Sequence, residues 1–127
     1  MNICLVGSMR NYERMLRLST HLKEQGHSVK VPVDVSSQGF ADRKQEKHKF
    51  MKEMFGIISD CDQVLAVNDE QRTGYQGYIG PNTFLQLGMA FGLGKSLYCL
   101  SAWDERLPYN EELQAMNIKK LDISLPS

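Results

Sequence analysis

The run Gly7-Ser8-Met9-Arg10 combines residue types that can bind an anion. It follows the apolar stretch at 3–6 and precedes a segment with the apolar spacing of a helix. Helix-start amides, a hydroxyl and a guanidinium can all meet one phosphate or carboxylate. A tight turn in which Ser8 caps the helix would use the same residues without a ligand. We expect an anion site here, because Arg10 adds its charge to the positive end of the helix.

A second group of candidates follows the predicted strand at 64–67. Asn68 opens a loop of about a dozen residues that reaches Gly80, whereas most connections have about 4 to 6 residues, and long loops in compact domains are often functional. Tyr75 and Tyr78 could stack on a planar base or sugar, and the loop's glycines would let it move as a lid. A polar surface loop without a ligand has the same composition.

The helix predicted after this loop carries two amides on one face. Asn82 and Gln86 are four residues apart, so they are neighbours on the helix surface. An amide cannot act as a nucleophile or general base in the way that a carboxylate does. Gln86 can therefore bind a ligand without acting as a nucleophile, and its alternative is an amide that satisfies backbone groups inside the fold.

Short apolar runs alternate with helical periods, which predicts an α/β protein with a flavodoxin-like or Rossmann-like three-layer sandwich and a mostly parallel sheet of about five strands. Pro32 indicates a strand end or an edge strand. In such a sheet, ligands bind at the carboxyl ends of the strands, so the segments 7–12, 68–83 and 101–109 should converge. The strands are expected at 2–6, 29–33, 64–67, 96–100 and 120–123, and the helices from after Ser8 to about Gln25 and at 42–59, 81–91 and 110–115.

Length and composition favour a single domain spanning 1–127, with 42% hydrophobic residues for one core. Lys plus Arg equals Asp plus Glu at 15 each, so no charge surplus points to a nucleic-acid polymer or a membrane. Three cysteines without metal-ligand or disulfide spacing are expected to be reduced core thiols in a cytoplasmic protein. No membrane span, metal or other cofactor is expected from these patterns.

Three segments together resemble the nucleoside 2-deoxyribosyltransferase superfamily, particularly its small members. They are ICLVGSMR at 3–10, SDCDQVLAVN at 59–68 and GYIGPNTFLQLGMA at 77–90, with Pro108 to Leu113 agreeing in the tail. The superfamily includes transferases that move deoxyribose between bases and hydrolases that cut the N-glycosidic bond of deoxynucleoside monophosphates. The resemblance implies a flavodoxin-like fold and a homodimer or higher homo-oligomer with sites near subunit interfaces.

The resemblance also implies roles for single residues. The turn at 7–10 matches the segment that helps to hold a 5′-phosphate, and Gln86 occupies the position of the nucleophilic Glu. The supporting Asp would fall near Met54, where only the adjacent Glu53 is acidic. A carboxylate stabilises and can trap an oxocarbenium-like centre, whereas an amide offers only a dipole. The expected substrate contacts are Gly7, Ser8, Met9, Arg10, Asn68, Tyr78, Gly80, Asn82 and Thr83.

Three hypotheses follow. The first is a nucleoside- or nucleotide-binding protein that is weak or inactive in N-glycosidic bond chemistry. The second is an active N-glycosidase or deoxyribosyltransferase that uses a carboxylate from a partner subunit or from its own loops. The loop acids are Asp69, Glu70, Asp104 and Glu105, and their simplest interpretation is solvated surface charge. The third is a non-catalytic interaction protein whose pocket binds nothing.

Overall fold

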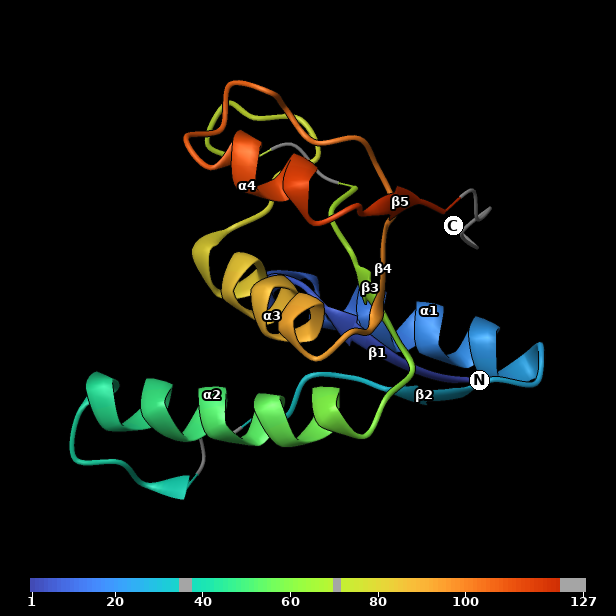
Figure 1. Ribbon diagram of the computed structural model, residues 1–127. Coiled ribbons are helices and arrows are strands. Elements are labelled where there is room, and N and C mark those ends of the chain that lie inside the picture. Colours follow the sequence, from blue (N-terminus) through green and yellow to red (C-terminus); the bar gives the residue numbers. More distant parts are fainter. Residues whose placement is uncertain (35–37, 70–71, 122–127) are drawn as a thin grey trace.

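The computed structural model describes residues 1–34, 38–69 and 72–121. Its centre is a five-stranded sheet in which all neighbouring strands are parallel (Figure 1). The order across the sheet is β2-β1-β3-β4-β5. The strands are β1 (Asn2–Val6), β2 (Ser28–Lys30), β3 (Gln63–Ala66), β4 (Ser96–Cys99) and β5 (Lys119–Lys120).

Helices cover both faces of this sheet, which confirms the predicted α/β sandwich (Figure 1). They are α1 (Tyr12–Glu24), preceded by the 3-10 turn η1 (Met9–Asn11), then α2 (Arg43–Ser59), α3 (Pro81–Gly92) and α4 (Asn110–Ala115). Successive strand residues point to opposite faces, so Leu5 and Leu65 pack on α1 while Cys4 and Val64 face α2 and α3. The helix residues buried in these two layers include Met15, Leu18 and Leu22 on one face, and Met54, Ile58, Leu87 and Ala90 on the other.

Local residue chemistry sets several helix boundaries. The Asp42 side chain accepts a hydrogen bond from the Gln45 amide at 2.8 Å and so begins α2. Ser8 accepts from the Arg10 amide at 3.3 Å, which is the predicted cap. Pro81 stands in the first turn of α3, where its missing N–H costs no helical hydrogen bond.

Two strands differ from their predicted bounds. The second strand was expected at 29–33 but ends at Lys30, because Pro32 has no N–H for the ladder; it lies at the sheet edge, as that proline predicts. The last strand covers Lys119–Lys120 instead of 120–123, and residues 122 and 123 lie outside the described part of the chain. No helix in the described ranges is long and apolar enough to span a membrane.

All three cysteines are buried free thiols. Burial raises the pKa of Cys99 to about 11 and raises the pKa of Cys4 still further. These thiols are consequently packing groups, because the reactive thiolate is not populated near neutral pH.

Candidate functional site

Asn68 joins the ends of two central strands to the following loop. Its side-chain amide donates to the carbonyls of Gly77 at 3.1 Å and Ser101 at 2.8 Å. Its oxygen accepts from the backbone amides of Leu100 and Ser101, both at 3.0 Å. Asn68 is 1% exposed and has its polar atoms bonded within the chain, so it positions the neighbouring segments. The segments predicted to converge here, 68–83 and 101–109, do lie together.

The loop after β3 contains a tight hairpin turn. Arg72 and Tyr75 exchange two backbone hydrogen bonds, each of 2.9 Å. Between them, Thr73 and Gly74 have φ values of 51° and 83°, which define a turn of type I′. Threonine rarely adopts this conformation, so the surrounding contacts must hold the turn in place.

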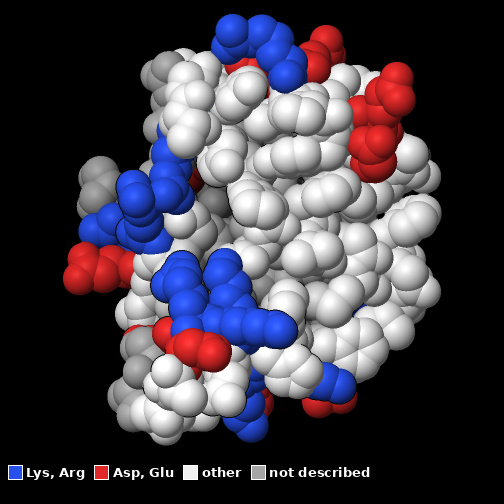
Figure 2. Space-filling view, turned by 90° about the vertical axis from the view of Figure 1, so that its left-hand side faces the viewer, with Lys and Arg blue, Asp and Glu red and all other residues white. Residues whose placement is uncertain are grey.

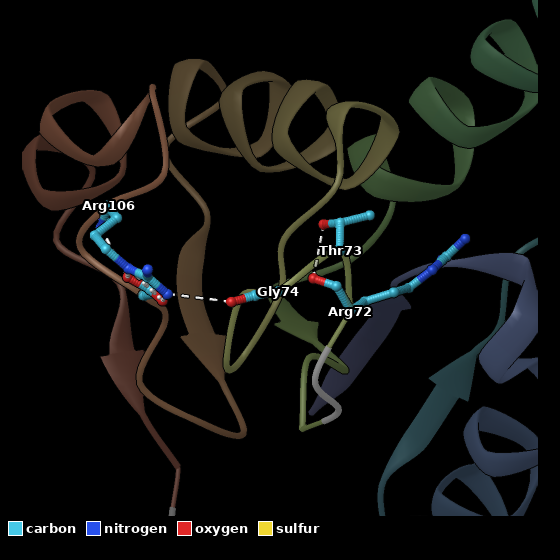
Figure 3. Close-up of polar contacts among 5 residues, drawn as sticks. Arg72, Thr73, Gly74 and Arg106 are labelled. Carbon is cyan, nitrogen blue, oxygen red and sulfur yellow. Dashed lines mark hydrogen bonds and ion pairs between the residues drawn. The ribbon is translucent and has the colours of Figure 1, made fainter.

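Those contacts come from the segment after β4. The Arg106 guanidinium donates to the Gly74 carbonyl at 3.1 Å (Figure 3). It also lies 5.7 Å from the centroid of the Tyr75 ring, and the Asp104 amide donates to the Gln76 carbonyl at 3.0 Å. In this structure the loop is therefore fastened to residues 104–106.

Two loop carboxylates are held in ion pairs, which corrects the expectation that they are solvated surface charges. Asp104 pairs with Arg106 at 2.7 Å, and hydrogen bonds from that guanidinium lower the pKa of Asp104 to about 2. Asp69 pairs with Arg14 of α1, and its side chain is 16% exposed. Glu105 is exposed, as expected, whereas Glu70 lies outside the described residues.

Aromatic rings support the same loop. Tyr75 stacks on Tyr78 with ring centroids 6.2 Å apart, so both predicted stacking rings use one face within the protein. Phe84 stacks on Tyr109 at 4.6 Å, and the Tyr109 hydroxyl donates to the Ile79 carbonyl. These contacts tie the loop to the start of α3.

A hollow of about 380 Å³ lies where the β1–η1 turn, the loop and the amino end of α3 meet. Every predicted substrate contact except Asn68 lines it. Sequence reasoning missed Arg72 and Thr73, although the unusual loop length pointed to their region. It also missed Arg43 and Phe50, because no local pattern places α2 beside this edge. The lining residues are Gly7, Ser8, Met9, Arg10, Arg43, Phe50, Arg72, Thr73, Tyr78, Gly80, Pro81, Asn82 and Thr83.

The lining of the hollow is cationic. Its charged side chains are Arg10, Arg43 and Arg72, with no carboxylate among the described lining residues. None of the three forms an ion pair with another described residue. The amino end of α3 begins at Gly80 without a side-chain cap, so its first amides add partial positive charge. On the side of the molecule at the left of Figure 1, clusters of basic side chains border a broad uncharged face (Figure 2).

Gln86 lies one helical turn beyond Asn82, behind the lining. It is 3% exposed, and its Oε1 atom has no hydrogen-bond partner among the described residues. Gln86 is not among the residues that line the hollow. The position expected for the supporting Asp is occupied by Met54, which is fully buried in the core. The adjacent Glu53 pairs with Lys49 at 2.8 Å and does not line the hollow.

The described residues contain no group of three or more His, Cys, Asp or Glu placed to hold a metal ion. The arrangement instead offers donors: guanidinium groups, helix-start amides and the hydroxyls of Ser8 and Thr83. Such a set binds an oxyanion.

Two solved structures share this fold. One is the CMP N-glycosidase BcmB of Clostridium botulinum, with a TM-score of 0.58 and 20% identity over 95% of this chain and 87% of that chain. The other is the 2-deoxyribosyltransferase of Bacillus psychrosaccharolyticus, with a TM-score of 0.52 and 20% identity over 78% of this chain and 71% of that chain. No protein-family model and no curated protein sequence matches the chain. The chain has a nucleoside 2-deoxyribosyltransferase-like fold.

Proposed function

We propose that this protein binds a nucleoside or nucleotide in the hollow and is weak or inactive in N-glycosidic bond chemistry. The proposal is carried by the hollow of about 380 Å³ at the carboxyl ends of the strands, which is lined by three arginines and by no carboxylate among the described residues. A phosphate would bind at the Gly7–Arg10 turn, and the base or sugar would lie toward Tyr78 and Asn82. The names of the two structural neighbours, which refer to nucleosides and a nucleotide, support this ligand class.

No described lining residue of the hollow is a carboxylate, which supports the proposal that the protein is weak or inactive in N-glycosidic bond chemistry. Glycoside cleavage ordinarily uses two carboxylates flanking the bond, about 5 to 9.5 Å apart. Of the three loop acids that the structure describes, Asp69 and Asp104 are each paired with an arginine, and Glu105 is exposed and does not line the hollow. Gln86 stands where the sequence resemblance places the nucleophilic Glu.

Gln86 retains a role in binding under this proposal. Its buried Oε1 atom has no hydrogen-bond partner among the described residues, and a buried acceptor without a partner costs about 1 to 3 kcal/mol. Gln86 does not line the hollow, so a sugar hydroxyl would donate to that oxygen and remove the penalty only after the neighbouring lining residues shift. The same amide would stabilise bound substrate without trapping the reacting carbon.

The test compares wild type with Gln86→Glu for base release from a panel of deoxynucleosides and their monophosphates. Gln114→Glu makes the same chemical change at an exposed position of α4 and serves as the control. We expect wild type and Gln114→Glu to release no base, and Gln86→Glu to gain activity. The panel ligands should also raise the melting temperature of wild type, by an amount equivalent to about 3 kcal/mol at about 100 times the dissociation constant.

Other outcomes favour the alternatives. Base release by wild type would contradict the inactive claim and point to another carboxylate, from the chain or from a partner subunit. No melting shift with any member of the panel would favour the non-catalytic interaction protein. The expected homo-oligomer stays a prediction, and sedimentation velocity with and without nucleotide tests it.

A further inference from the structure

Three separate elements each bring one guanidinium to the same hollow. Arg10 follows β1, Arg43 is the first residue of α2, and Arg72 belongs to the loop turn. Their positions span more than sixty residues of sequence, so the fold brings these like charges together. Like charges repel in a shared space, and their gathering without a described carboxylate indicates that a multiply charged anion compensates them.

One phosphate group does not match this site well. A phosphate monoester carries about −1.5 to −2 charge at pH 7, whereas three guanidiniums and a helix amino end present more positive charge than that. Space is also available, because a second hollow of about 130 Å³ shares four lining residues with the first. Arg43 lines both hollows, and the second also carries Asp34, Glu46 and Lys47, whereas Arg10 and Arg72 line the first alone.

We propose that the hollow is a two-phosphate site, which selects a nucleotide bearing a diphosphate over the corresponding monophosphate. This inference rests on the proposed nucleotide-binding function and specifies its ligand. One phosphate lies at the Gly7–Arg10 turn, and the second is held by Arg72 and Arg43. Arginine suits this task because its planar fork binds phosphate oxygens in pairs.

Contacts within the protein hold the Arg72 guanidinium in position without a ligand. Its Nη1 donates to the Ser8 hydroxyl at 2.7 Å, which joins the loop to the anion-binding turn. Arg106 holds the Gly74 carbonyl on one side of the hairpin turn, while the Arg72 side chain extends away on the other (Figure 3). The tight turn therefore presents the Arg72 guanidinium at the hollow with little freedom left to lose on binding.

Calorimetric titration with matched pairs of nucleoside mono- and diphosphates, and with inorganic phosphate and pyrophosphate, tests the proposal. We expect each diphosphate to bind at least about tenfold more tightly than its monophosphate, since hydrogen bonds to charged groups each contribute about that factor or more. Arg72→Gln and Arg43→Gln should each bring this ratio toward one. Arg17→Gln removes the same charge from an exposed position of α1 and should leave the ratio unchanged.

The outcomes distinguish failure of the two-phosphate site from failure of the proposed nucleotide-binding function. Equal affinity for mono- and diphosphates would overturn the two-phosphate site and leave nucleotide binding intact. Binding of pyrophosphate but of no nucleotide would contradict the proposed function. A ratio that falls equally in Arg17→Gln would show that net charge alone is responsible, and would also overturn the inference. Far-ultraviolet circular dichroism verifies that each variant is folded before titration.

Discussion

Gly77 is the position at which one added methyl group should disturb the candidate site most. Its φ is 59°, a conformation that favours glycine, and a Cβ built there would lie 2.2 Å from the Ala102 carbonyl oxygen. The same Cβ would lie 3.1 Å from the Trp103 Cα atom. Because both neighbours are backbone atoms, Gly77→Ala must push the loop and the segment after β4 apart.

Gly74→Ala is the matched control for this substitution. Gly74 has a φ of 83° and open space around the added carbon, so alanine there suffers backbone strain without a clash. That strain costs about 1 to 2 kcal/mol. Gly77→Ala adds overpacking of about 1 to 3 kcal/mol and weakens the hydrogen bond from Asn68 to the Gly77 carbonyl. We therefore expect Gly77→Ala to cost about 3 to 5 kcal/mol of unfolding free energy.

Urea unfolding of wild type and both variants measures these costs, with circular dichroism as the signal. The free energies of unfolding should differ between the two variants by at least about 1 kcal/mol, the lower end of the overpacking cost, with similar slopes against urea concentration. Equal destabilisation by both substitutions would refute the reasoning, since it would mean that the loop does not pack against residues 102 and 103 as described.

Two further predictions concern the contacts that hold the loop. Asn68→Ala should lower the free energy of unfolding by about 2 to 4 kcal/mol, because its buried hydrogen bonds are lost. The control Asn82→Ala, at the hollow, should lower it by less than about 1 kcal/mol. A similar loss for both variants in urea titrations would contradict this prediction. Because the pKa of Asp104 is lowered to about 2, its pairing with Arg106 should contribute stability above about pH 4 and lose it as the pH falls toward 2. The melting temperatures of wild type and Asp104→Asn should therefore converge in acid, and a gap at pH 2 as large as the gap at pH 7 would count against the pair.

Local signals in the sequence predicted most of the architecture. The strand positions follow from short apolar runs, and the bounds of α3 follow from Pro81 and the glycines near its end. Pro32 correctly indicated an edge strand. The parallel order of strands in turn led to the expected meeting of the 7–10 turn with the loop after β3. These features depend on hydrophobic periodicity and backbone chemistry, which act over a few residues.

Other features of the site could not be predicted from the sequence and became apparent only in the tertiary structure. The bond between Arg72 and Ser8 joins residues 64 positions apart, and the pair of Arg14 with Asp69 joins residues 55 apart. No local pattern shows whether an asparagine such as Asn68 contacts a ligand or holds two loops together, because the residue type is the same in both cases. Asp69 was misjudged for that reason, because Arg14 approaches it only in three dimensions. The partner of Asp104 is Arg106, two residues further along the chain, so that pair could have been anticipated from the sequence.

The sequence by itself determined the α/β class, the turn at residues 7–10 and the presence of Gln86 in place of an acid, because each depends on residue identity and short-range spacing. Only the tertiary structure decided that Arg43 of α2 and Arg72 of the loop share one hollow with that turn. The physical reason is that charge in a cavity is a sum over elements brought together by packing, and packing depends on contacts between residues far apart in the chain.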